Sequence, residues 1–261
     1  MKPKRTKVAV VTVNFNNSRI TEDCIYSFAG ISKKNIDLDL IVVDNGSVEE
    51  GSRKLEKKLP NVKFIYSKTN LGFAGGNNLG IEYALKTGAT HILLINNDAT
   101  IVEKNFLSEM MKAKGDIVSP LVKYPNNGKL TFDYGGLVDK LFGRNTHLHS
   151  LPKNIPDYFS GVCLLIKSKV FKKVGLLNDR FFLYYEDADF CLRAKKAGFK
   201  LGFCESSSIF HHLSTSANKF GKRKIYILAN SHLWFCLKHL PFYSMPFYLS
   251  YNLYLRLKTL L

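Results

Sequence analysis

Cysteine is scarce in this sequence of 261 residues, and no two cysteines have the short spacing of a zinc site. The five that occur are odd in number, widely spaced and mostly surrounded by apolar residues: Cys24, Cys163, Cys191, Cys204 and Cys236. This pattern favours buried free thiols, because disulfides persist mainly in oxidising compartments. We therefore expect a protein of the cytoplasm.

Signals for secretion and for membrane crossing are also missing. The apolar run VAVVTV (8–13) follows a basic start but leads into polar residues 14–17 instead of a small-residue cleavage site. Leu240–Leu255 carries no charge, but it contains Pro241 and Pro246 and is shorter than the ~20 apolar residues of a spanning helix. We expect the first run to be a strand and the second to stay on one side of a membrane.

Acidic residues are outnumbered by basic ones, 21 to 38, which gives a formal net charge of +17. Such an excess indicates an anionic partner, which could be nucleic acid, a membrane surface or a phosphorylated substrate. The contents of 46% hydrophobic and 23% charged residues are those of a globular protein. We expect one large domain, or one domain with an appendage.

Strand and helix patterns alternate through the first half of the chain. Strands are expected at Val8–Val13, Leu40–Val43, Val62–Tyr66 and His91–Ile95, and helices at Ser18–Ala29, Glu50–Leu59 and Gly75–Lys86. This alternation predicts an α/β fold with a Rossmann-like, mainly parallel central sheet and helices on both faces. Such a half is typical of nucleotide binding.

The second half of the chain has a different residue composition. Residues 118–160 are rich in Pro, Gly and Asn and contain a short β-like run at Lys129–Tyr134, which predicts a substrate-facing insertion or β-ribbon. Phe159–Ile166 is apolar enough to return to the sheet, and Ala188–Lys196 has helical periodicity closed by Gly198.

The C-terminal segment, residues 224–261, is helical and apolar in pattern and admits two interpretations. It is rich in Tyr, Phe and Leu, contains Trp234, and follows the basic run 222–224. It could lie on an anionic membrane surface, where aromatic residues suit the headgroup level and each Lys or Arg adds about 1 kcal/mol of attraction. It could equally be a helical hairpin that packs on the domain.

Two clusters of polar residues are candidate halves of one active site. Asn96-Asn97-Asp98 follows the expected strand His91–Ile95, at the sheet edge where α/β proteins bind ligands. Asp98 could bind Mg²⁺ or Mn²⁺ together with diphosphate oxygens. A turn with a helix cap is the alternative for this cluster.

The second cluster, Glu186-Asp187-Ala188-Asp189, precedes a helical pattern. The positive end of a helix dipole favours ionised carboxylates, as a general base requires. Helix capping is the alternative, but a cap needs a single acid. Arg193 would pair with Asp189 one turn later or contact a phosphate.

Five motifs occur in a fixed order: VVTVNFNN (10–17), IVVDNGS (41–47), NLGFAGGNNLG (70–80), LLINNDAT (93–100) and FSGVCLLIKSKVFKKVGLLNDRFFLYYEDADFCLRAKKAGF (159–199). The series resembles the family-2 inverting glycosyltransferases of the GT-A fold, particularly their rhamnosyltransferase-like branch. The resemblance covers residues 7 to 240. It implies a catalytic domain at 1–223, with a nucleotide-binding half at 1–117 and an acceptor-binding half at 118–223.

The resemblance also implies roles for individual residues. Asp44 would read the base by accepting the imide N–H of uracil or thymine, although a turn aspartate is the alternative. The nucleotide-sugar contacts would be Val13, Asn14, Asn16, Asp44, Asn70, Gly72, Phe73, Asn77, Asn96 and Asn97. The catalytic base would be Asp187, with Glu186 as second choice, and the acceptor contacts would be Tyr184, Tyr185 and Asp189.

The metal motif departs from the family pattern. The family has two acidic residues around one spacer, whereas Asn96-Asn97-Asp98 keeps only the last carboxylate. His211, which opens the segment His211–Ser216, resembles a family histidine that approaches the metal or the diphosphate. We expect Asp98 and His211 to be the ligands of Mg²⁺ or Mn²⁺.

The expected activity is transfer of a sugar from dTDP-rhamnose or a UDP-hexose to a hydroxyl of a cell-surface glycan or polyprenyl-diphosphate-linked acceptor. The protein would act at the anionic inner face of the cell membrane. A sugar-nucleotide pyrophosphorylase is an alternative, but it needs a Gly-rich basic loop where Asn14–Asn17 stands. A nucleic-acid-binding protein is another alternative, but the basic residues are spread out rather than gathered in a stripe, so no nucleic acid is expected.

Overall fold

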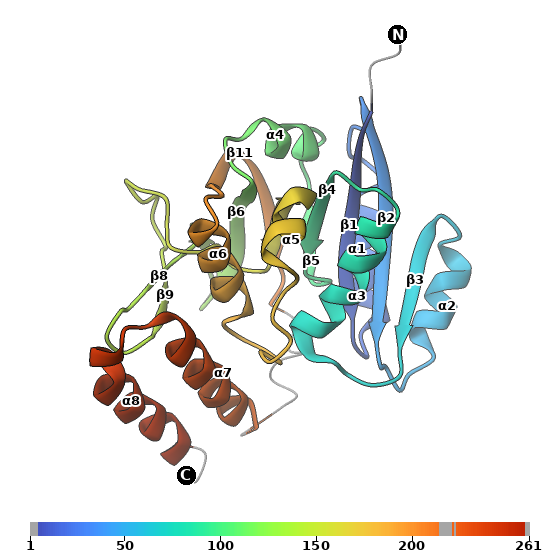
Figure 1. The fold of residues 1–261 in the computed structure, drawn as a ribbon. Coiled ribbons are helices and arrows are strands. Elements are labelled where there is room, and N and C mark those ends of the chain that lie inside the picture. The colour runs from blue at the N-terminus through green and yellow to red at the C-terminus, as the bar shows by residue number, and fades with distance from the viewer. Residues whose placement is uncertain (1–4, 214–220, 222, 259–261) are drawn as a thin grey trace.

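The fold is built on a nine-stranded sheet with helices on both faces (Figure 1). The computed structural model describes residues 5–213, 221 and 223–258. The first four residues, the second half of the His211–Ser216 segment and the last three residues of the expected C-terminal segment lie outside the described residues.

The first four strands of the sheet are parallel and lie in the order β3-β2-β1-β4. They are β1 (Thr6–Asn14), β2 (Ile36–Asn45), β3 (Val62–Ser67) and β4 (His91–Ile95), connected by α1 (Ser18–Ser27), α2 (Gly51–Lys58) and α3 (Gly72–Lys86). The expected alternation of strands and helices is confirmed, although α3 begins three residues earlier than the expected Gly75. Because the strands are parallel, their carboxyl ends meet at one edge of the sheet.

The other half of the sheet is mixed. Strand β10 (Cys163–Lys167) runs antiparallel to β4 and β6 (Ile117–Asn126), while β11 (Leu201–His211) is parallel to β6. Two short strands complete it: β5 (Ala99–Ile101) beside β11 and β7 (Lys129–Asp133) beside β6. The parallel pattern changes at β10 because the chain between β6 and β10 forms strands and turns but no helix, whereas a parallel return needs a long crossover.

Both faces of the sheet are buried, which explains the nearly continuous apolar run of β1. Ala9 and Val11 pack in a cluster that includes residues of α3, α5 (Ser168–Val174) and α6 (Glu186–Lys196). Val8 and Val10 point to the opposite face and pack with residues of α1 and α4 (Phe106–Lys112). Side chains alternate across a strand, so a strand covered on both faces is apolar throughout.

The insertion between β6 and β10 forms the expected β-ribbon. Its outer part is a second sheet of two short strands, β8 (Gly136–Val138) and β9 (Asn145–His147). The loop between them packs against the C-terminal helices, where the backbone of Gly143 has a φ of +68° and leaves no room for a side chain beside Cys236.

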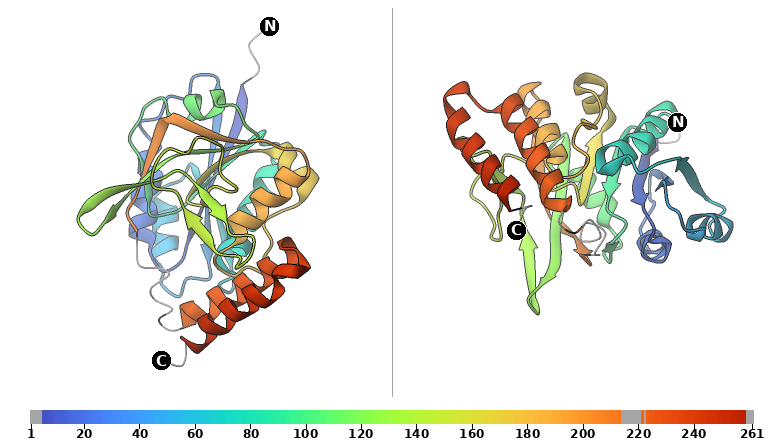
Figure 2. Two further views of the ribbon diagram at one scale, coloured as in Figure 1. Left: turned by 90° about the vertical axis from the view of Figure 1, so that its left-hand side faces the viewer. Right: turned by 90° about the horizontal axis from the view of Figure 1, so that it is seen from below.

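The C-terminal segment is a helical hairpin that packs on the domain (Figure 2). It consists of α7 (Arg223–His239), a 3₁₀ turn (Phe242–Ser244) and α8 (Met245–Leu257). Phe235 packs against Tyr185 at 4.9 Å between ring centroids, and Phe247 against Phe142 at 5.7 Å. No helix in the described ranges is long and apolar enough to cross a membrane.

Gly80 in α3 and Gly30 in the turn after α1 offer a test of this packing. A methyl group on Gly80 of α3 would overlap Val11 and press on Val43, whereas nothing lies within 4 Å of the same position on Gly30. We expect Gly80→Ala to lower the free energy of unfolding in urea by about 1–2 kcal/mol, since overpacking outweighs the gain in helix propensity. Gly30→Ala is the control, and equal stability of the two variants would contradict the packing of α3 on β1.

Candidate active site

A cavity of about 530 Å³ lies at the sheet edge where the parallel strands end. Its wall contains ends of β1, β2 and β4 and the beginning of α3. It includes these sequence-predicted residues: Val13, Asn70, Gly72, Phe73, Asn77, Asn96, Asn97, Asp98 and His211. The wall is completed by Phe15, Asn45, Ile95, Phe182, Leu183, Tyr184, Leu213 and Lys224.

Asp98 and His211 form a pair in this cavity. His211 Nε2 lies 3.0 Å from Asp98 Oδ1, and Asp98 is only 6% exposed. A carboxylate and an imidazole are ligands that Mn²⁺ accepts, and oxygens of a diphosphate could fill further positions. No group of three or more His, Cys, Asp or Glu side chains suited to a metal occurs among the residues that the structure describes. Asp98 and His211 alone would be a partial set of ligands, and metal binding by this pair stays a prediction.

Three predicted nucleotide contacts, Asn14, Asn16 and Asp44, lie outside the lining of this cavity. Asp44 is 4% exposed and accepts hydrogen bonds from the Ser47 N–H (2.9 Å), the Asn14 amide (3.1 Å) and the Ser52 hydroxyl. Asn16 Oδ1 accepts the Val48 N–H at 2.9 Å. In this structure these side chains tie the loops after β1 and β2 together, and base reading by Asp44 stays a prediction.

Asn45 is a cavity residue that the motif reading missed. Its Oδ1 accepts the Leu71 N–H at 3.0 Å, and its Nδ2 donates to the Gly72 carbonyl at 2.9 Å. The Asp-Asn-Gly sequence predicts a turn at Asn45, yet β2 continues through it. Asn45 thereby fixes the loop that leads into α3.

A second cavity, of about 390 Å³, adjoins the first. The two share Phe73, Asn96, Leu183 and Tyr184 in their walls. The predicted residues of the second cavity are Tyr184, Tyr185, Glu186 and Asp187. Residues that the sequence reading did not select also line it: Arg144, Asn145, His147, Tyr158, Ser160, Gly161, Val162, Leu228, Tyr251 and Leu255. Asp98 and Asp187 thus line adjoining cavities.

The Asp187 carboxylate is fixed at the start of α6. It accepts the Gly161 N–H at 3.0 Å on Oδ2 and the Ala188 N–H at 2.7 Å on Oδ1. Burial raises the pKa of Asp187 above its ordinary value, although the two N–H donors and nearby His147 oppose this. A carboxylate with a raised pKa is a stronger base than a free one, which suits the removal of a proton.

Glu186 is the more strongly perturbed member of the pair. Burial raises its pKa well above the ordinary value, and the charge of Asp187 raises it further. Its Oε2 has no hydrogen-bond partner among the described residues. Because two adjacent buried carboxylates cannot both ionise easily, the negative charge falls on Asp187, which has the two N–H donors.

The two tyrosines before α6 have an uncommon backbone. Tyr184 and Tyr185 have φ angles of 72° and 71°, a region that L-residues rarely adopt. The Tyr185 hydroxyl donates to the Gly143 carbonyl at 3.1 Å, and its ring packs between His232 and Phe235. This anchoring offsets the backbone strain beside Glu186 and Asp187.

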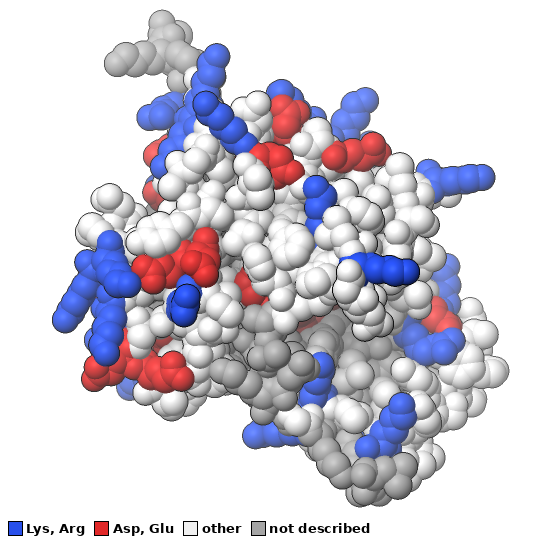
Figure 3. Space-filling view, turned by 180° about the vertical axis from the view of Figure 1, so that it is seen from behind, with Lys and Arg blue, Asp and Glu red and all other residues white. Residues whose placement is uncertain are grey.

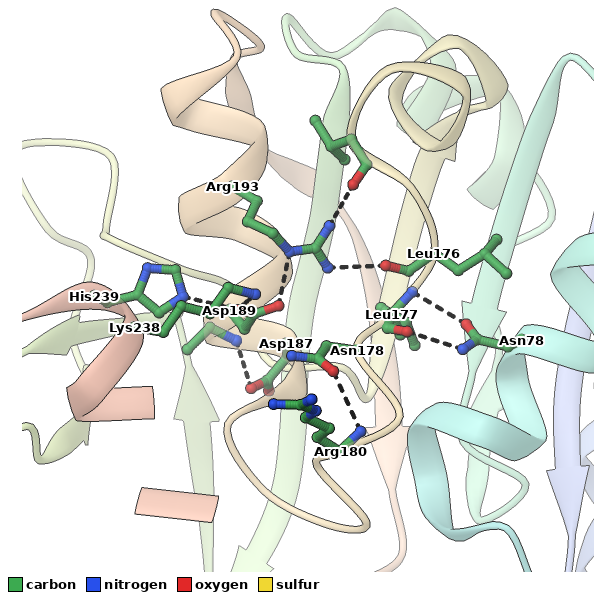
Figure 4. A network of polar contacts seen from close by, with 12 residues as sticks. Asn78, Leu176, Leu177, Asn178, Arg180, Asp187, Asp189, Arg193, Lys238 and His239 are labelled. Carbon is green, nitrogen blue, oxygen red and sulfur yellow. Dashed lines mark hydrogen bonds and ion pairs between the residues drawn. The ribbon is translucent and has the colours of Figure 1, made fainter. Parts of the chain in front are cut away.

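Asp189 is fully buried and holds α6 to α7 (Figure 4). Its carboxylate lies 2.7 Å from each of three cationic or titratable groups, Arg193 Nε, Lys238 Nζ and His239 Nε2. Arg193 also donates to the carbonyls of Val174 and Leu176. An acceptor contact by Asp189 stays a prediction, and the geometry indicates a positioning role.

The sequence matches the family model described as "Glycosyl transferase family 2" over residues 9–175. The chain belongs to glycosyl transferase family 2. It is 25% identical over 226 residues to the low-salt glycan biosynthesis hexosyltransferase Agl10 of Haloferax volcanii. The aligned region covers 82% of this chain and 69% of that protein. It is 22% identical over 240 residues to the N-acetylglucosaminyl-diphospho-decaprenol L-rhamnosyltransferase of Mycobacterium tuberculosis, covering 80% and 77%.

This glycosyltransferase shares its fold with proteins of known structure. GalNAc-T7, crystallised with UDP, GalNAc and Mn²⁺, superposes with a TM-score of 0.66 at 15% identity, covering 80% of this chain and 44% of that one. TarS residues 1–349 of S. aureus in complex with UDP superposes with a TM-score of 0.58 at 17% identity, covering 87% and 65%. The expected GT-A fold and the expected enzyme class are confirmed, which leaves no support for the pyrophosphorylase and nucleic-acid-binding alternatives.

The Asp189 network predicts a dependence of stability on pH. Burial alone would raise the pKa of Asp189, but His239, Arg193 and Lys238 outweigh it and lower the pKa to about 2. The carboxylate therefore contributes stability that is complete above its ordinary pKa and is lost as the pH falls toward 2.

We expect Asp189→Asn to lower the free energy of unfolding at neutral pH by about 2–3 kcal/mol and to flatten its decline between about pH 4 and 2. Urea unfolding at several pH values measures this. Asp179→Asn, in the exposed part of the loop before α6, is the control. An unchanged acid profile for Asp189→Asn would contradict the ion-pair network.

Proposed function

We propose that this glycosyltransferase transfers a sugar from a nucleoside diphosphate, bound in the first cavity, to a hydroxyl of an acceptor bound in the second. The observation that carries the proposal is that Asp98 and Asp187 line adjoining cavities with a common wall. A site for a diphosphate and a site for a base would then meet at one sugar carbon.

The donor in this proposal is dTDP-rhamnose or a UDP-hexose. Relatives named as hexosyl- and rhamnosyltransferases, including a dTDP-rhamnosyl transferase of Shigella flexneri at 24% identity over 218 residues, support this class. The start of α3 lies in the wall of the first cavity, and a helix N-terminus favours the negative charge of a diphosphate. Asp98 and His211 would hold Mg²⁺ or Mn²⁺, which would offset charge on the leaving diphosphate.

The reaction is a single displacement. Asp187 removes the proton from the acceptor hydroxyl, whose oxygen forms a bond to the anomeric carbon as the bond to the diphosphate oxygen breaks. The nucleoside diphosphate leaves with the bonding electrons, and the anomeric configuration inverts. Gly161 and Ala188 keep the Asp187 carboxylate aligned through their N–H groups, while the raised pKa of Glu186 disfavours a second negative charge beside it.

The acceptor is proposed to be a cell-surface glycan or a glycan on a polyprenyl diphosphate, reached from the inner face of the cell membrane. A relative named for a diphospho-decaprenol acceptor supports this class. The 3₁₀ turn that joins the two helices of the hairpin exposes large aromatic residues, with Phe242 82% and Tyr243 70% exposed. These side chains suit the headgroup region, and the net charge of +17 suits an anionic leaflet.

Nucleic acid is not a proposed partner. Lys and Arg are scattered over the face shown in Figure 3, with acidic residues between them, and form no continuous stripe there. A groove that tracks a phosphate backbone needs such a stripe.

Replacement of the proposed base tests the mechanism. We expect Asp187→Asn to reduce sugar transfer by about 10²–10⁴-fold, because no group then accepts the hydroxyl proton. Nucleotide affinity, measured by calorimetry, stays unchanged. In the native enzyme the rate of transfer rises with pH through the raised pKa of Asp187, since only the ionised form is active. Asp179→Asn is the matched control, and full activity of Asp187→Asn would refute the assignment.

Thermal shifts test the donor and the metal together. We expect UDP or dTDP, but not GDP, to raise the melting temperature, and Mn²⁺ to increase that rise, since a ligand stabilises the state that binds it. His211→Gln and Asp98→Asn should lose the Mn²⁺-dependent part. His212→Gln, which changes the neighbouring side chain that bonds Thr100, is the control. A Mn²⁺ effect that persists in Asp98→Asn would place the ion elsewhere.

A further inference from the structure

Arg144 occupies a distinctive place in the second cavity. It immediately precedes β9 and lines the cavity together with Asp187 and Glu186. The hairpin supplies apolar residues to the same cavity, Leu228 from α7 and Tyr251 and Leu255 from α8. The cavity thus combines catalytic acids, an arginine and an apolar wall.

The guanidinium of Arg144 is oriented by aromatic rings. It lies 5.1 Å from the centroid of Phe142 and 5.8 Å from that of Tyr251, and its Nη2 donates to Asp139 Oδ2 at 3.1 Å. Within the described part of the chain, nothing accepts a hydrogen bond from its Nε or Nη1. The side chain is 52% exposed, so the remaining donors are accessible. A stacked guanidinium with a free edge is suited to bidentate binding of a phosphate.

The loop that carries Arg144 is held in place independently of a ligand. Asp139 Oδ1 accepts the N–H groups of Leu141 and Phe142 at 2.9 and 3.0 Å. His232 of α7 contacts the Phe142 carbonyl at 2.8 Å through Nε2. Because the loop is anchored on both sides, the orientation of the arginine costs little additional entropy when a ligand binds.

Among the described residues that line this cavity, only Arg144 and His147 are basic. Both are ion-paired, Arg144 with Asp139 at 3.1 Å and His147 with Asp133 at 2.9 Å. They differ in the donors that remain: the planar guanidinium of Arg144 keeps several N–H groups for a second anion, whereas the imidazole of His147 has a single further ring nitrogen. Arg144 is therefore better suited to bind an anionic group in the cavity.

We infer that Arg144 binds the diphosphate of a prenyl-diphosphate-linked sugar acceptor, with the prenyl chain on Leu228, Tyr251 and Leu255 and the sugar toward Asp187. The inference rests on the proposed function and adds a residue-level subsite to it. The cavity wall combines acids, a cation and apolar side chains, and these suit the sugar, the diphosphate and the lipid of such an acceptor.

Direct binding of farnesyl diphosphate to the whole protein tests this subsite without a known acceptor sugar. Calorimetry is run with the donor cavity saturated by UDP or dTDP and Mn²⁺, so that the probe cannot bind there. We expect farnesyl diphosphate to bind, and farnesol and inorganic diphosphate each to bind at least about tenfold more weakly. Farnesol lacks the diphosphate that would contact Arg144, and inorganic diphosphate lacks the prenyl chain that would contact the apolar side chains.

Two variants of Arg144 and one matched control complete the experiment. Arg144→Gln should weaken farnesyl diphosphate binding by about 10–100-fold, and Arg144→Lys by a smaller factor, because lysine keeps the charge but loses the planar fork. Arg180→Gln is the control, since Arg180 also stacks on an aromatic ring of the hairpin, Trp234 at 5.0 Å, but does not line the second cavity. Nucleotide affinity should be unchanged in all three variants.

Equal affinity of Arg144→Gln and the native protein for farnesyl diphosphate would overturn the inference. So would an equal loss in Arg180→Gln, or equal binding of inorganic diphosphate and farnesyl diphosphate. A further contrary outcome is that Arg144→Gln binds phosphatidylglycerol vesicles more weakly while its affinity for farnesyl diphosphate is unchanged. Arg144 would then contact anionic lipid headgroups and not an acceptor diphosphate. Failure of the protein to bind any nucleoside diphosphate would instead refute the proposed function.

Discussion

The buried charge of Asp189 is the constraint on which the active-site region depends. A carboxylate with no exposure to water is costly unless it is fully paired, and Arg193, Lys238 and His239 supply the pairing from two helices. The network sets the orientation of α6 and the position of α7 together. Glu186 and the proposed base Asp187 lie less than one turn from Asp189 on the same helix, so the network also positions them. The hairpin therefore belongs to the packing that holds the candidate site in place and is not only an appendage.

The parallel half of the fold was predictable because its signals are local. The run His91–Ile95 is a strand with the bounds that its apolar residues predict, and α2 lies within one residue of its expected range at each end. The antiparallel direction of β10 was not predictable, because it depends on how the β-ribbon returns the chain. The long β11 was also missed, since its polar middle, where the register shifts between Cys204 and Ser208, hides a strand pattern.

The residues of the candidate site also differ in whether local sequence signals could predict them. Residues at strand ends, such as Asn96 and Asp98, could be selected from sequence because a sheet edge brings strand ends together. Arg144 and Tyr251 could not, since their meeting requires a loop of the ribbon to touch a helix more than a hundred positions later. Amphipathic pattern indicates which face of such a helix is apolar, but not which distant loop covers it.

Phe73, Asn96, Leu183 and Tyr184 belong to the walls of both cavities. A molecule bound in one cavity therefore lies against side chains that the other cavity also presents. An enzyme built in this way is expected to follow sequential kinetics, in which both substrates are bound before either product leaves.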